Sequence, residues 1–152
     1  MFAKLNARLK MYLANLDPMA AVASVVALVV AANQPFYPLY LHAIAGWAAA
    51  PAWLTLLSTP AFAAVPWLAR RHSLAGRALL PLAGIANTML GAKLMGPGAA
   101  EEVFLLPCAL LAGVLFRPGE RWAALALLAL AALAHELSPI FGDGLKDQAA
   151  AV

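Results

Sequence analysis

Long apolar stretches separated by short polar connections constrain this chain more than any other feature of its sequence. A helix that crosses the hydrocarbon of a bilayer needs about 20 mostly apolar residues, and several stretches approach that length. Hydrophobic residues make up 64% of the 152 residues and charged residues 11%. Soluble domains are about 45–50% apolar and about 25% charged. The composition excludes an ordinary soluble domain, a disordered chain, a disulfide scaffold and a nucleic-acid-binding module. We expect an all-α integral membrane protein with one membrane domain over 1–152.

The apolar stretches predict a bundle of about five transmembrane helices, with six as the main alternative. Asp17 followed by Pro18 is typical of a helix start, and Pro139 is expected to end the last helix. The apolar run over 38–69 is too long for one straight span, so 38–50 is predicted to be interfacial or re-entrant. The expected spans cover about residues 19–34, 51–69, 78–95, 101–116 and 122–137.

The two ends of the chain are expected to lie outside the bundle. Residues 1–16 carry leucines three to four positions apart with basic residues between them, which predicts an amphipathic helix on the membrane surface. A signal peptide is the alternative, and its cleavage would leave four spans. Residues 139–152 are expected to form a tail on the outer side.

The basic residues predict the orientation of the chain. Eight of the ten fall on one side of the predicted membrane, and only Lys93 and Lys146 fall on the other. Because basic loops stay in the cytoplasm, we expect a bacterial inner-membrane protein with a cytoplasmic N-terminus and a periplasmic C-terminus. The net charge of +3 is then a topology signal rather than a nucleic-acid footprint. The eight residues are Lys4, Arg8, Lys10, Arg70, Arg71, Arg77, Arg117 and Arg121.

Most other ionisable residues gather in one layer at the outer ends of the predicted spans. Imidazole and carboxylate groups together suit a metal ion, and two histidines can hold a haem. The alternative is that Glu101 and Glu102 begin a helix favourably, with Lys93 paired to one of them. A polar pocket for a small ligand is a third interpretation. The candidate metal or haem residues are His42, His135 and Glu136, and the other members of the layer are Lys93, Glu101 and Glu102.

Asn87 lies near the middle of the third predicted span, where its amide needs partners. We expect an interhelical hydrogen bond there, with ligand contact as the alternative. Motifs of hydrolases, nucleotide-binding loops and zinc proteases are absent from the sequence, so the prediction is a protein without enzymatic activity.

The stretch over 87–121 resembles the multi-span sensor regions that precede bacterial histidine kinase, diguanylate cyclase or adenylate cyclase domains. The matching features are Asn87, the turn Gly96-Pro97-Gly98, Phe104 with Pro107, and the exit Phe116-Arg117 followed by Glu120-Arg121. The resemblance implies a ligand-facing pocket lined by Asn87, Glu101, Glu102 and Phe104. Since those regions feed an output domain, it also implies action through a partner chain.

These observations together predict a sensor-like or accessory subunit that binds a small ligand or a partner protein at its outer rim. Its expected partners are the lipid bilayer and another membrane protein or a second copy, and nucleic acid is excluded. One alternative is a metal- or haem-binding subunit of an electron-transfer assembly. The other is a small transporter, in which Asn87 would matter.

Overall fold

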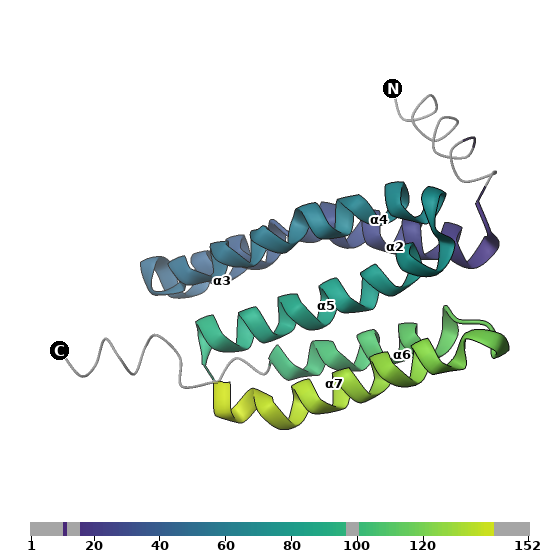
Figure 1. Ribbon diagram of the computed structural model, residues 1–152. Coiled ribbons are helices and arrows are strands. Elements are labelled where there is room, and N and C mark those ends of the chain that lie inside the picture. The colour runs from purple at the N-terminus through teal and green to yellow at the C-terminus, as the bar shows by residue number, and fades with distance from the viewer. Residues whose placement is uncertain (1–10, 12–15, 97–100, 142–152) are drawn as a thin grey trace.

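The computed structural model describes Met11, residues 16–96 and residues 101–141 (Figure 1). Every regular element in this part of the chain is a helix, which confirms the all-α prediction. The elements in chain order are α2 (Pro18–Asn33), α3 (Phe36–Ala45), η1 (Gly46–Ser58), α4 (Thr59–Arg71), α5 (Ser73–Met95), η3 (Glu101–Phe104), α6 (Leu105–Val114), η4 (Pro118–Glu120) and α7 (Arg121–Phe141), where η marks a 3-10 helix.

Three helical stretches of the described residues are long and apolar enough to cross a membrane: Pro18–Arg71, Ser73–Met95 and Pro118–Pro139. The first of them, 54 residues long, folds back on itself, because α3 packs against η1 and α2 packs against α4. Gly46, at the reversal, has a φ of 59°, in a region that glycine adopts without steric cost. A shorter apolar helix covers Glu102–Val114.

The described chain therefore runs back and forth in five limbs, with α5 at the centre (Figure 1). The limbs are α2 with α3, η1 with α4, α5, η3 with α6, and α7. Helix α5 contacts α2, η1 and α4 on one side and η3, α6 and α7 on the other. The start of α2 and the end of α7 consequently lie at opposite ends of the bundle (Figure 1).

Small residues allow the helices to approach closely around α5. A methyl group added at Gly76 would overlap the backbone of Ala69, and one added at Gly84 would lie 2.5 Å from the Sγ atom of Cys108. Between apolar helices in lipid, such close packing is a principal source of association. The largest buried apolar cluster comprises Ala23, Ala27, Phe62, Val65, Leu80, Ala83 and Leu115.

The helix boundaries differ from the sequence prediction at three places. Residues 38–50 do not form one separate segment, because the chain reverses at Gly46 and divides them between two antiparallel limbs. The third helix begins at Ser73 rather than near 78, since only His72 separates α4 from α5. Pro139 does not end α7, which continues to Phe141; a proline near a helix end removes only one backbone hydrogen bond.

The expected surface helix over 1–16 and most of the expected tail over 139–152 lie outside the described residues. Of the first, only Met11 and Leu16 are described, and of the second, only 139–141. Both stay predictions.

Candidate functional site

A chain of three polar side chains joins three limbs inside the bundle. The Gln34 amide nitrogen donates to the Ser58 hydroxyl at 2.9 Å, and the Ser58 hydroxyl lies 2.8 Å from the Oδ1 atom of Asn87. Gln34 follows the last residue of α2, Ser58 ends η1, and Asn87 lies in α5. The expected interhelical hydrogen bond of Asn87 is therefore confirmed.

The hydrogen-bond capacity of Ser58 leaves one polar atom of Asn87 available. The Ser58 hydroxyl lies 2.8 Å from both the Asn87 Oδ1 atom and the Thr55 carbonyl oxygen, yet it carries a single proton. Either Ser58 donates to Asn87, or it donates to the Thr55 carbonyl and accepts from an Asn87 amide rotated by half a turn. In both arrangements the second polar atom of the amide is left for another partner.

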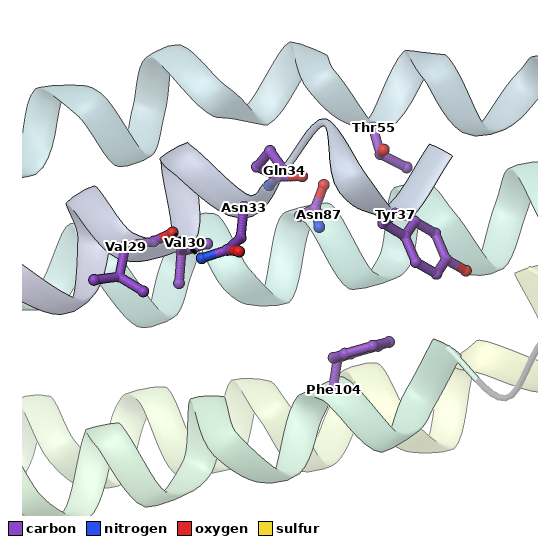
Figure 2. A pocket seen from close by; sticks show the side chains of 8 residues that line it. All are labelled: Val29, Val30, Asn33, Gln34, Tyr37, Thr55, Asn87 and Phe104. Atoms are coloured by element: carbon purple, nitrogen blue, oxygen red, sulfur yellow. Dashed lines mark hydrogen bonds between the residues drawn. The ribbon is translucent and has the colours of Figure 1, made fainter. Parts of the chain in front are cut away.

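This free amide atom borders a cavity of about 380 Å³ (Figure 2). Asn33, exposed at the end of α2, donates its own amide N–H to the Val29 carbonyl at 2.8 Å, which leaves its side-chain oxygen as an acceptor. Tyr37 and Phe104 pack edge to face, with ring centroids 6.3 Å apart. None of the lining residues is charged. They are Val29, Val30, Asn33, Gln34, Tyr37, Thr55, Asn87 and Phe104.

A smaller cavity of about 150 Å³ adjoins the first, because both are lined by Val30, Asn87 and Phe104. Its remaining lining is almost wholly apolar and comes from α4, α5 and α6. The two cavities together run along one face of α5, from an amide-rich end to an apolar end. The remaining lining residues are Phe62, Leu80, Gly84, Thr88, Pro107, Cys108 and Leu111.

The predicted ligand-binding residues do not all line one cavity. Asn87 and Phe104 line the same cavity, from α5 and η3. Glu102 lines a different cavity, between α6 and α7. Lys93 is exposed on α5 and lines neither of them. The side chain of Glu101 lies outside the described part of the structure.

The predicted metal or haem residues belong to two different helices, His42 to α3 and His135 with Glu136 to α7. His42, on α3, packs edge-on against Trp47 at 5.1 Å between ring centroids, and its buried Nδ1 atom has no hydrogen-bond partner among the described residues. His135 is exposed on α7 and lines the same cavity as Glu102, while Glu136 is exposed beside it. Nowhere in the described residues do three or more metal-ligating side chains come together.

A charged cluster closes the opposite end of the bundle, where α2 begins. Arg77, only 2% exposed, donates from both terminal nitrogens to the Glu120 carboxylate at 2.7 Å and from one of them to the Leu115 carbonyl at 2.8 Å. Asp17 accepts from the Ser73 hydroxyl at 2.9 Å and pairs with Arg117. The cluster thus joins the start of α2, the start of α5 and the α6–α7 connection.

Neighbouring side chains shift the pKa of the two carboxyl groups of this cluster, Asp17 directly before α2 and Glu120 at the end of η4. Partial burial alone would raise the pKa of Asp17, but hydrogen bonds from Ser73 and Arg117 and the charges of Arg117 and Arg77 together lower it. Hydrogen bonds from Arg77 and from the Arg117 backbone N–H lower the pKa of Glu120 to about 2. Both groups are therefore held as carboxylates.

Sequence patterns did not predict most of the hydrogen-bond and ion-pair partners in the polar chain around Asn87 or in the charged cluster around Arg77. Asp17 was predicted to cap α2, yet its carboxylate makes no cap hydrogen bond and turns to Ser73 and Arg117 instead. Arg77 was counted only as a cytoplasmic basic residue, although its place inside the apolar helix Ser73–Met95 signals a need for a partner. Ser58 ends a 3-10 helix and carries no sequence signal of its own.

Comparison of the chain with protein-family models, with curated proteins and with solved structures finds no match.

Proposed function

We propose that this protein is an integral membrane protein whose five limbs each cross the bilayer. The main support is the outer surface of the bundle, which carries large apolar side chains. Trp47 is 84% exposed, Leu57 71% and Leu110 70%. Because these side chains lie on η1 and on α6, large apolar groups are exposed on both sides of α5, and extensive exposed apolar surface is typical of contact with lipid or protein. The end that holds Arg70, Arg71 and Arg121 is the cytoplasmic end under the positive-inside rule.

Within that frame, the protein binds a small, uncharged amphiphile in the cavity beside Asn87. The observation that carries this proposal is an unsatisfied amide atom of Asn87 next to the open side-chain oxygen of Asn33, in a space walled by Tyr37 and Phe104. The two side-chain amides offer hydrogen bonds to a hydroxyl or carbonyl head, and aromatic rings pack against its body.

The lining favours a neutral head and an apolar tail. No carboxylate, imidazole, amine or guanidinium group lines the cavity, so a charged head would lose its hydration without gaining a counter-ion. The adjoining apolar cavity between α4 and α6 continues from the same residues and suits the tail. A long-chain alcohol or a quinone-like carbonyl compound has this chemistry.

The position of the cavity supports a sensor-like or accessory role, in line with the resemblance of residues 87–121. Its walls come from α2 and η1 on one side and from η3 and α6 on the other, all around α5. A ligand that contacts both groups stabilises one arrangement of them over another. That change would reach a partner membrane protein.

Photolabelling tests the proposal. The purified protein in lipid nanodiscs is irradiated in three separate samples. One contains a photoreactive long-chain alcohol, and the other two contain the photoreactive carboxylate or the photoreactive amine of the same chain length. We expect the alcohol alone to label the cavity residues, and Asn87→Leu to abolish this labelling. Ala86→Leu, an exposed neighbour on α5, is the matched control. Equal labelling by all three probes, or labelling spread over the outer surface, would contradict the proposal.

A further inference from the structure

A second cavity, of about 430 Å³, lies between α6 and α7. From α7 it is lined by residues at positions i, i+3, i+4 and i+7, which share one face of a helix. From the antiparallel limb it is lined by two residues of η3 and three of α6. The α7 residues are Leu128, Ala131, Ala132 and His135, and the others are Glu102, Val103, Leu105, Leu106 and Ala109.

The polar groups of this groove lie at one end. Because α6 and α7 run antiparallel (Figure 1), Glu102 at the start of the one limb lies at the level of His135 near the end of the other. Ala109 and Leu128 mark the opposite end. The groove is thus an apolar channel that carries a carboxylate and an imidazole at its outer end.

The groove also opens onto the surface of the bundle. Leu106 is 65% exposed and Leu128 36%, and the side chain of His135 is exposed as well. In a bilayer this surface faces lipid, so the occupant comes from the lipid itself.

The head group, and not the chain, decides which lipid is held. An acyl chain that leaves the bilayer for the groove exchanges one apolar environment for another, since lipid tails are as apolar as leucine. The carboxylate of Glu102 accepts N–H bonds and attracts a cation, and a neutral imidazole donates one N–H bond. A head group that carries both an ammonium and a phosphate matches this pair.

We propose that the groove between α6 and α7 is a binding site for an aminophospholipid. The ammonium donates to the Glu102 carboxylate, His135 donates to the phosphate, and one acyl chain lies along the apolar channel. The site rests on the membrane embedding proposed above, and it is independent of the ligand beside Asn87.

Lipid retention tests this site. The protein is reconstituted in nanodiscs that hold equal parts of phosphatidylethanolamine, phosphatidylglycerol and phosphatidylcholine with identical acyl chains. It is then extracted in mild detergent, and native mass spectrometry identifies the lipids that stay bound to it. We expect phosphatidylethanolamine to be enriched roughly tenfold over phosphatidylglycerol, which corresponds to about 1.4 kcal/mol. Phosphatidylcholine, which keeps the charge but has no N–H donor, should be retained less well than phosphatidylethanolamine.

Three variants make the test specific. Glu102→Gln should reduce the retained lipid to the bulk ratio, whereas Glu136→Gln, which removes the same charge from an exposed neighbour outside the groove, should leave the enrichment intact. Ala132→Leu fills the channel at an exposed position and should lower retention of all three lipids.

Several outcomes would overturn the proposal. A bulk lipid ratio in the unaltered protein, an equal effect of Glu136→Gln, or a lipid-free dimer would each show that the groove does not select an aminophospholipid. Failure of the protein to enter the nanodiscs would instead contradict the membrane embedding itself.

Discussion

Arg77 and Glu120 form a two-pronged ion pair, in which each terminal nitrogen of the guanidinium lies 2.7 Å from a carboxylate oxygen. Arg77 is inside the apolar helix α5, whereas Glu120 belongs to the short connection before α7. The pair fixes the α6–α7 hairpin against the centre of the bundle, at the end where α2 begins.

Removing one partner of this pair should destabilise the fold. Glu120→Ala leaves the buried Arg77 guanidinium without its main counter-ion, and breaking a buried pair in this way costs about 3 kcal/mol. Equilibrium unfolding in mixed detergent micelles measures the change. Arg121→Gln, at an exposed position of α7, is the control and should change the free energy of unfolding little. Equal stability of the two variants would contradict the importance of the pair.

Stability should fall in acid because of the same cluster. The folded-state pKa values of Asp17 and Glu120 both lie below the ordinary carboxyl values of 3.8 and 4.5. Each group therefore contributes stability that is complete above its ordinary pKa and is lost as the pH falls through the lowered one. Between about pH 4.5 and 2 the free energy of unfolding should decrease. Arg77→Met should flatten this dependence, and an unchanged pH profile in that variant would contradict the assignment.

The close contact between Gly84 and Cys108 predicts a rescue experiment. Gly84→Ala places a methyl group 2.5 Å from the Cys108 Sγ atom, whereas the Cys108 Cβ atom lies at 4.0 Å. The single variant should be destabilised, and adding Cys108→Ala should restore the loss by removing the sulfur. A double-mutant cycle should give a coupling energy of about 1–2 kcal/mol. A coupling energy near zero would show that α5 and α6 are not in contact at this point.

Removal of two neighbouring hydroxyl groups should change the stability of the protein in opposite ways. Ser58→Ala deprives the Gln34 and Asn87 amides of their common partner, at a cost of about 1–3 kcal/mol. The buried Thr59 hydroxyl oxygen has no hydrogen-bond partner among the described residues, so Thr59→Val should be neutral or stabilising. Unfolding curves of the two variants compare them directly, and equal losses would contradict the polar chain.

The five-limb arrangement predicts opposite sides for two connections. In a Cys108→Ala background, a cysteine introduced at His72 should react with a membrane-impermeant maleimide only from the cytoplasmic side. A cysteine at Trp47, beside the Gly46 reversal, should react only from the outer side. Reaction of both cysteines from the same side would contradict the topology proposed here.

The all-helical class follows from the sequence pattern, because long apolar stretches between short polar connections favour helices. The helix start at Pro18 was predictable from local chemistry, and the start near Trp122 from the beginning of an apolar stretch. The course of residues 38–50 was not, because a reversal at one glycine with φ of 59° leaves no periodic signal. Pro51, Pro60 and Pro66, in the longer apolar run over 38–69, suggested a break but did not locate it.

The candidate site was predictable only in part. Asn87 was identifiable because an amide in an apolar layer requires a partner, and Phe104 through the resemblance. Their neighbours Gln34, Ser58 and Tyr37 come from two other limbs, and long-range packing of this kind is invisible in local sequence. Likewise, Asp17 and Arg117 are far apart in sequence, and no spacing rule connects them.

The position of Glu120 so late in the chain makes its pairing with Arg77 a marker of completed assembly. Without the connection that carries Glu120, Arg77 would lack its principal carboxylate, and an unpaired charge among packed apolar helices is costly. Asp17 lies 3.7 Å from the Arg77 Nε atom, but the two-pronged pair comes from Glu120, the last residue of the cluster along the chain. The Arg77–Glu120 pair therefore forms only after the chain has been made as far as Glu120, and it records that the α6–α7 hairpin has joined the helices before it.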